Sequence, residues 1–200
     1  MLTLARPRAR ARHAVASALV VALLALPSSA SAATYRIKAY SNSTFSPSVL
    51  TVNQGNLVKW INKGGYHEVD ITQPSSYLST NPSAEPGKMA ERTVVAGSFA
   101  FVCTFHASSG MRGTLNVKPT LSRSGSTVTV RLGPVLSSYR HTIERRRGSS
   151  GAWTSSTTTA GADYKTFSLS GGTWQFRAEL VRVSNGTSSN YSPVVSITVP

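Results

Sequence analysis

Short runs of alternating apolar and polar residues recur along the chain, and almost no segment shows the apolar period of a helix. The runs are rich in Val, Thr, Ile, Phe and Tyr and are separated by Gly, Pro, Asn and Ser, as is typical of an all-β protein. The candidate strands before residue 119 are TYRIKAY, SVLTVN, NLVKWIN, HEVDI, ERTVV, FAFVC and GTLNVK. This density of short strands predicts one antiparallel β-sandwich.

A second series of alternating runs follows a pause at VKPTLSRSGST. Its members are STVTVRL, SYRHTIERR, AWTSSTT, DYKTFSL, TWQFRAELVRV and VVSITV. Their spacing fits another small sandwich, so we predict two β domains, residues 33–118 and 119–200, with the boundary between Lys118 and Leu121. The Pro-rich stretch 73–88 is predicted to be a long surface loop that could hold a short helix.

The first 32 residues have a different character from the rest of the chain. Four arginines precede a thirteen-residue apolar run at 14–26, and Ala30-Ser31-Ala32 has a small-x-small pattern. These features predict a signal peptide (residues 1–32) of the general secretory route. The run is too short to cross about 30 Å of hydrocarbon, and no later segment resembles a membrane span. The mature protein is therefore predicted to be secreted or extracytoplasmic, whether extracellular, in the cell wall or periplasmic.

The mature chain is predicted to be strongly basic. Removing the four leader arginines leaves 17 of the 21 Lys and Arg residues against 7 acidic residues, a net charge of +10. Such a charge favours an acidic protein partner or anionic cell-surface polymers. The positive residues are scattered and no aromatic–basic binding motif is present, which argues against a nucleic-acid partner.

Cys103 is the only cysteine of the chain and lies in FAFVCTFHASSGMRG. One cysteine cannot form an internal disulfide, and an accessible thiol outside the cytoplasm is prone to oxidation. Cys103 is therefore either buried and inert or a metal ligand. By period two, Phe99, Phe101, Cys103 and Phe105 share one strand face, which would place the thiol at the end of a core-facing row.

His106 and Met111 follow Cys103 on one tight loop, so three donor side chains could converge there. Thiolate and thioether are soft ligands and imidazole is borderline, which suits copper better than magnesium or calcium. Methionine is also a poor ligand for a closed zinc site. A second imidazole could come from His67, which follows a strand and a Gly-Gly turn, whereas His141 is interpreted as an ordinary strand histidine of the second series. Two His, one Cys and a weak axial Met describe a trigonal copper site for one-electron exchange.

The first domain resembles the cupredoxins, in particular the plastocyanin and pseudoazurin branch. The segment CTFHASSGMRG matches the family's Cys-x2-His-x4-Met-x-Gly pattern. FSPSVLTVNQGNLVKWINKGGYHEV matches its upstream Phe-x-Pro, Val-x-x-Gly, Val-x-Trp and final His. The resemblance implies a Greek-key β-sandwich that binds one type 1 (blue) copper ion and transfers single electrons by Cu(I)/Cu(II) cycling. The ligands that it implies are His67, Cys103, His106 and Met111.

Glu68 departs from the family pattern, which commonly has Asn, Ser or Thr after the first ligand histidine to tie the two ligand loops together. Its carboxylate either points to solvent with Asp70 or approaches the site, where its negative charge would favour Cu(II). The resemblance also implies that the ring edge of His106 is the electron port. Phe105 could extend the apolar patch around this port and Tyr66 could border it, although core packing of Phe105 fits the strand row equally well.

No pair of carboxylates, no nucleophile with a base and no open metal position is evident in the sequence, so the chain is predicted not to be an enzyme. The second domain resembles fibronectin type III modules through STVTVRLGP, SYRHTIERRRGSSGAW and LSGGTWQFRAELVRVSNGTSSNYSPVVSITV. This implies a small immunoglobulin-like sandwich that serves as a spacer or binding platform.

The leading hypothesis is a secreted blue-copper electron carrier with an unidentified redox partner protein. One alternative is an extracellular copper sequestration or delivery protein that uses the same four ligands. A less favoured alternative is an adhesion protein whose first domain has no metal function.

Overall fold

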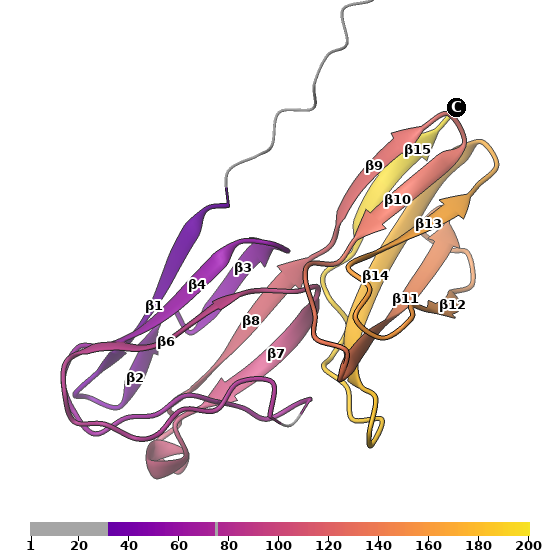
Figure 1. Ribbon diagram of the computed structural model, residues 1–200. Helices are drawn as coiled ribbons and strands as arrows, with labels where there is room; N and C mark the ends of the chain where they lie inside the picture. Colours follow the sequence, from indigo (N-terminus) through magenta and orange to yellow (C-terminus); the bar gives the residue numbers. More distant parts are fainter. Residues whose placement is uncertain (1–31, 75) are drawn as a thin grey trace, which may run out of the picture. The chain divides into compact units, whose positions relative to one another are not determined.

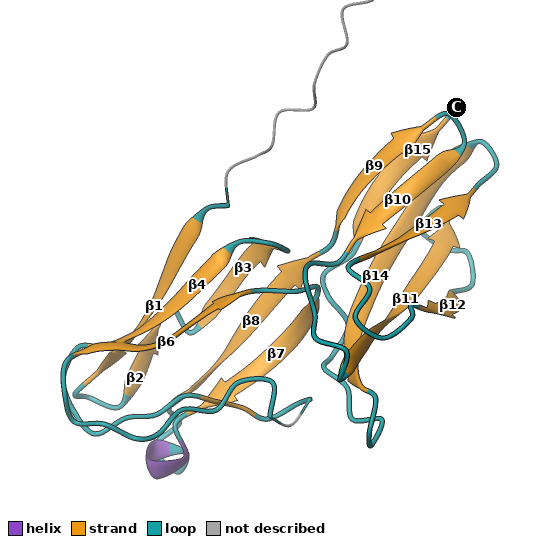
Figure 2. Cartoon of the chain, in the orientation of Figure 1, coloured by secondary structure: helices purple, strands orange, loops and turns teal. Residues whose placement is uncertain are grey.

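The computed structural model describes residues 32–74 and 76–200 (Figure 1). All but the last residue of the predicted signal peptide lies outside the described residues, so that assignment stays a prediction. The described chain is all-β, as predicted, with fifteen strands and one short 3-10 helix (Figure 2). Within the described residues, no helix is long and apolar enough to cross a bilayer.

The first eight strands form two four-stranded sheets, which we call the first sandwich. One sheet has the order β2-β1-β4-β6. Its strands are β1 (Thr34–Tyr40), β2 (Thr44–Ser46), β4 (Leu57–Asn62) and β6 (Gly87–Thr93). The other sheet has the order β3-β8-β7-β5. Its strands are β3 (Val49–Asn53), β5 (Asp70–Ile71), β7 (Gly97–Val102) and β8 (Arg112–Lys118).

The first sandwich is mixed and not purely antiparallel, which corrects the prediction. Strand β1 pairs in parallel with β4, and β3 pairs in parallel with β8. After the β1–β2 hairpin the chain crosses to the opposite sheet as β3 and then returns as β4 beside β1, so β1 and β4 run in the same direction. Strand β2 was not predicted, and β5 is shorter than the predicted strand HEVDI.

Aromatic side chains fill the space between the two sheets of the first sandwich. Trp60 on β4 and Phe101 on β7 are each 1% exposed. The Phe101 ring meets those of Phe45 and Trp60 edge-to-face, with centroid distances of 5.1 and 6.2 Å. Such contacts stabilise a core beyond the burial of apolar area. The strand that carries Cys103 is therefore anchored in a rigidly packed interior.

The remaining strands form a three-stranded and a four-stranded sheet, which we call the second sandwich. The first has the order β13-β10-β9, with β9 (Thr120–Ser124), β10 (Thr127–Arg131) and β13 (Tyr164–Ser168). The second has the order β12-β11-β14-β15, with β11 (Tyr139–Arg147), β12 (Thr154–Thr157), β14 (Gly172–Arg182) and β15 (Val195–Val199). All of these pairings are antiparallel.

Strand β9 lies in the stretch where the alternating pattern pauses and where no strand was predicted. It is the edge strand of its sheet and none of its residues is fully buried, so its sequence lacks the apolar alternation of a core strand. Residues 73–88 were predicted to be a loop that could hold a short helix, and no helix is found in the described part of this stretch. Isolated β-bridges instead tie this segment back to the end of the first sandwich, pairing His67 with Ser83 and Asp70 with Ser79.

The two sandwiches share buried contacts at their junction. Ser98 on β7 and Asn190 exchange backbone hydrogen bonds of 2.9 and 3.0 Å. Tyr139 and Leu180 of the second sandwich belong to the apolar cluster of the first, and Ala96 belongs to the apolar cluster of the second. The strands up to β8 and those from β9 onward thus pair in separate sheets. Each apolar cluster nevertheless includes residues of the other sandwich, and the division into two domains stays a prediction.

His141 lies on β11 opposite Leu180, as expected of a strand histidine, and its side chain is completely buried. Neither ring nitrogen has a hydrogen-bond partner of good geometry among the described residues. Burial lowers the pKa of His141 to about 4, and the nearby Ala96 backbone offsets this effect only in part. His141 is therefore neutral in the folded protein at neutral pH.

We expect His141 to make folding stability depend on pH. The unfolded chain binds a proton at His141 below its ordinary pKa of about 6.5, whereas the folded chain does so only near pH 4. The free energy of unfolding should therefore fall by about 3 kcal/mol as the pH drops from 6.5 to 4. Urea unfolding of wild type and His141→Leu, with a metal chelator present, measures the difference. Parallel pH curves for the two proteins would contradict the expectation.

Candidate metal centre

Cys103 ends the core-facing row of β7, as predicted. Phe99, Phe101 and Cys103 are 0%, 1% and 0% exposed, so the thiol points into the interior. The row stops there because the chain enters the 3-10 helix Thr104–His106. Phe105 therefore leaves the core face and is 54% exposed. Its side chain is available at the surface and does not pack in the interior.

Backbone hydrogen bonds fold the segment after Cys103 into a compact turn. The Cys103 N–H donates to the Met111 carbonyl, and the Met111 N–H donates to the His106 carbonyl, each at 3.1 Å. A third bond of 3.1 Å runs from the His106 N–H to the Cys103 carbonyl. The Arg112 guanidinium donates to the Ala107 carbonyl at 2.8 Å. The turn therefore keeps His106 and Met111 close to Cys103 along the chain.

His67 reaches the thiol from a distant part of the sequence, just after the Gly-Gly turn that follows β4. Its Nε2 lies 3.1 Å from the Gly64 carbonyl oxygen. Because a carbonyl can only accept, Nε2 carries the hydrogen and the lone pair is on Nδ1. A side chain at Gly65 would place its Cβ 2.6 Å from this Nε2, and Gly65 has φ of +99°. Glycine is thus required for the ring to lie against the turn.

Asn62, the last residue of β4, holds this turn in place and was not singled out from the sequence. Its side chain is 1% exposed. Its Nδ2 donates to the carbonyls of Gly65 (2.9 Å) and Ser83 (3.0 Å), and its Oδ1 accepts from the Gly64 N–H (2.9 Å). An Asn whose side chain bonds the backbone two residues on, ahead of a Gly pair, is a known turn signal and could have identified it.

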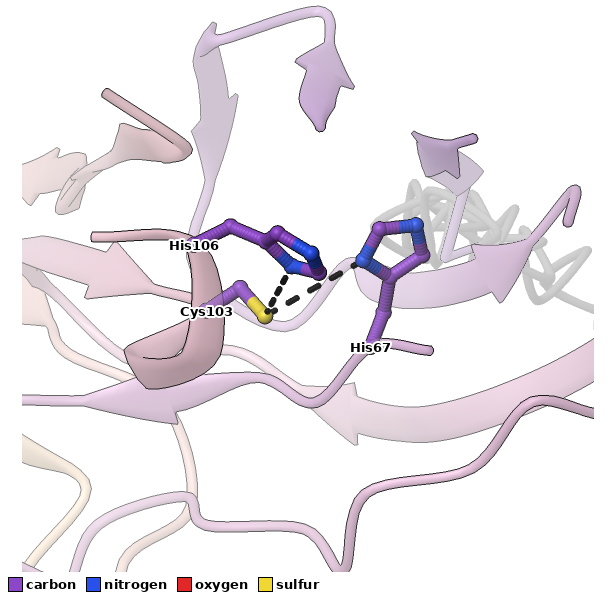
Figure 3. A group of neighbouring side chains, drawn as sticks. All are labelled: His67, Cys103 and His106. Carbon is purple, nitrogen blue, oxygen red and sulfur yellow. Dashed lines mark hydrogen bonds between the residues drawn. The ribbon is translucent and has the colours of Figure 1, made fainter. Parts of the chain in front are cut away.

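The side chains of His67, Cys103 and His106 converge (Figure 3). The Cys103 Sγ lies 4.0 Å from the Nδ1 of His67 and 3.4 Å from the Nδ1 of His106. All three ligand atoms lie within 4.8 Å of one another. Cys103 and His67 are buried, and His106 is half-buried. The structure therefore brings together the three predicted His and Cys ligands, and His141 is not among them.

Met111 is the fourth predicted ligand. Its side chain is 1% exposed and packs in the same apolar cluster as Cys103. The two backbone bonds described above join its main chain to those of Cys103 and His106. A weakly held thioether in an apolar environment is what an axial position of a copper site requires.

Glu68 approaches the site and does not point to solvent. The residue is 9% exposed. Its Oε1 accepts a 3.2 Å hydrogen bond from the Thr104 backbone N–H and a short one from the Thr104 hydroxyl. These bonds link the segment of His67 to that of Cys103. Among the described residues, the cluster of ligand atoms does not include Glu68.

An exposed aromatic pair borders the half-buried His106. The rings of Tyr66 and Phe105 meet edge-to-face, with centroids 5.1 Å apart. Tyr66 is 48% exposed and Phe105 is 54% exposed. Each of these residues is the sequence neighbour of a clustered histidine.

No protein-family model matches the sequence, and no curated protein matches it. Several solved structures resemble the chain. An oxidised plastocyanin from Dryopteris crassirhizoma is 24% identical and has a TM-score of 0.35, and the match covers 42% of this chain and 99% of that one. A pseudoazurin from Hyphomicrobium denitrificans is 16% identical with a TM-score of 0.36, covering 42% and 75% of the two chains.

An amicyanin from Paracoccus versutus is 23% identical with a TM-score of 0.34, covering 44% of this chain and 83% of that one. Each of these three matches covers less than half of this chain. The resemblance of the second half to fibronectin type III modules stays a prediction. The roles of individual residues rest on the distances and hydrogen bonds of this chain.

We expect Asn62→Ala to loosen the turn that orients His67. The substitution leaves the Gly64 N–H and the Gly65 carbonyl without their buried partner, at a cost of about 2–3 kcal/mol. Urea unfolding measures this loss, and the ¹⁵N NMR signals of His67 should no longer report a single Nε2–H tautomer. Asn42→Ala, at an exposed position, is the matched control. Equal effects of the two substitutions would contradict the role of Asn62.

Proposed function

We propose that this chain binds one copper ion through His67, Cys103, His106 and Met111 and carries single electrons. The observation that supports this most directly is the convergence of one thiol and two imidazole Nδ1 atoms from segments 36 residues apart in sequence. When bound, copper would supply reversible exchange between Cu(I) and Cu(II).

The donor atoms fit one ion of this kind in both chemistry and spacing. Donors that bind one metal at about 2.0–2.3 Å and about 120° to each other lie roughly 3.5–4 Å apart. The thiol-to-imidazole separations of 3.4 and 4.0 Å match this range. The sulfur ligands favour copper over the hard cations, and Met111 fits copper better than zinc.

The chain's own groups favour electron transfer over catalysis. Cys103 and His67 are buried, so the interior holds two of the donors away from water. The Gly64 carbonyl fixes the His67 ring, and the backbone bonds of the turn fix His106. A scaffold that holds its ligands in place limits reorganisation when the charge of the site changes. No position for a substrate is needed in this mechanism.

The half-buried ring of His106 and the Tyr66–Phe105 pair are proposed as the port through which electrons pass. Their exposed apolar surface suits close contact with a partner protein. The flanking Arg112, which is exposed and bound to the His106 loop, adds positive charge. Together with the basic composition of the chain, this favours an acidic redox partner. Export of the protein remains a prediction from the leader.

We expect the metal-free protein to bind one equivalent of Cu(II) and to develop an intense visible band of copper–thiolate origin. Cys103→Ser should abolish the band because the thiolate is lost. Met111→Leu should retain the band and change the reduction potential. His141→Leu, outside the cluster, is the control and should leave both unchanged. Colourless wild-type protein with bound copper would contradict the proposal.

The same sample separates electron transfer from copper delivery. A carrier keeps its metal through repeated one-electron reduction and oxidation. Rapid loss of Cu(I) to a chelator during this cycling would favour delivery.

We expect Phe105→Ser to slow electron exchange through the proposed port. The substitution removes an exposed ring beside His106 without touching a donor atom. NMR line broadening in mixtures of the oxidised and reduced protein measures self-exchange, which should fall about tenfold, corresponding to a loss of about 1.4 kcal/mol. Leu136→Ser, at a 67% exposed apolar position of the second sandwich, is the matched control. Equal rates for the two variants would rule out this port.

A further inference from the structure

Glu68 places a carboxylate beside the segment of Cys103, and no ion pair joins it to a cation within the described part of the chain. It is 9% exposed, and its Oε1 receives hydrogen bonds only from the N–H and hydroxyl of Thr104, which are neutral donors. Among residues 32–74 and 76–200, none of the ion pairs involves Glu68. These ion pairs are Lys59–Glu91, Lys88–Glu91 and Arg177–Glu144.

A buried charge is unfavourable unless an opposite charge compensates it. Hydrogen bonds from neutral donors orient and partly stabilise the Glu68 carboxylate, but they do not neutralise it. The Cys103 thiolate would add a second negative charge when it binds a metal. The hydrogen bonds of Glu68 attach its carboxylate to Thr104, the residue that follows Cys103 in the chain.

The summed charge of the copper ion, the Cys103 thiolate and the Glu68 carboxylate differs between the two oxidation states of copper. A divalent ion neutralises the thiolate and the Glu68 carboxylate together, whereas a monovalent ion leaves one negative charge enclosed. Reduction adds one electron to the ion and changes the net charge of this group from zero to minus one. No bond to Glu68 forms or breaks, because Glu68 is not in the cluster of ligand atoms.

We propose that Glu68 is the counter-charge of the metal centre, a positioning residue that favours divalent over monovalent copper and thereby lowers the reduction potential. The same charge destabilises the metal-free protein, because only a bound cation compensates it. This inference rests on the proposed copper function. It goes beyond that function by assigning the balance between the two oxidation states to one residue outside the ligand set.

The test compares Glu68→Gln with wild type at neutral pH. Glutamine keeps the size and the acceptor oxygen for Thr104 and removes the charge. Glu85→Gln is the matched control, because it makes the same change of charge at an exposed position, where solvent and salt screen it. Thr104→Val removes the hydroxyl donor and keeps the charge.

In the metal-free protein, Glu68→Gln should raise the urea midpoint of unfolding, whereas Glu85→Gln should leave it unchanged. In titrations with Cu(II), and with Cu(I) under reducing conditions, Glu68→Gln should weaken Cu(II) binding about tenfold more than Cu(I) binding. For a one-electron couple this raises the reduction potential by about 59 mV. Thr104→Val should not raise the potential.

A counter-charge and a hydrogen-bond link predict different effects of Glu68→Gln. Loss of a counter-charge stabilises the metal-free protein and weakens Cu(II) binding. A lower urea midpoint together with equal losses of Cu(II) and Cu(I) affinity would show that Glu68 only ties the two segments together, and the inference would be wrong. Unchanged midpoint and potential would also overturn it. Wild-type protein that fails to bind copper would instead refute the proposed function, and the metal-free comparison does not depend on that result.

Discussion

The hydrogen bond from the His67 Nε2 to the Gly64 carbonyl sets the orientation of the first imidazole in the candidate metal centre. It places the ring proton on the side away from Cys103 and leaves the Nδ1 lone pair facing the thiol. The bond exists only because Gly65 has no side chain to occupy the space of the ring. Asn62 then holds the whole turn against the neighbouring loop. The first imidazole is thus pre-oriented before any metal is bound.

Most strands could be predicted from alternation, and the exceptions have physical reasons. Strands β2 and β9 were missed because β2 has three residues and β9 is a partly exposed edge strand without an apolar row. The parallel pairing of β1 with β4 was also missed, because alternation reports which face is buried and not which strand lies alongside. The loop at 73–88 is irregular because it follows the end of the first sandwich through isolated bridges.

The candidate site was predictable where its members are close in sequence. Cys103, His106 and Met111 lie on one turn, so their spacing alone indicates proximity. His67 required the pattern of a strand followed by Gly-Gly, together with the resemblance to a known family. The orientation of Glu68 could not be predicted, because it depends on how the segments of residues 67–70 and 103–106 pack against each other.

Strand β7 has a different neighbour at each end. Ala96, just before it, packs in the core of the second sandwich, and Ser98 near its start is paired with Asn190. Cys103 follows its last residue. A single strand therefore joins the contact with the second sandwich to the residue that carries the thiol.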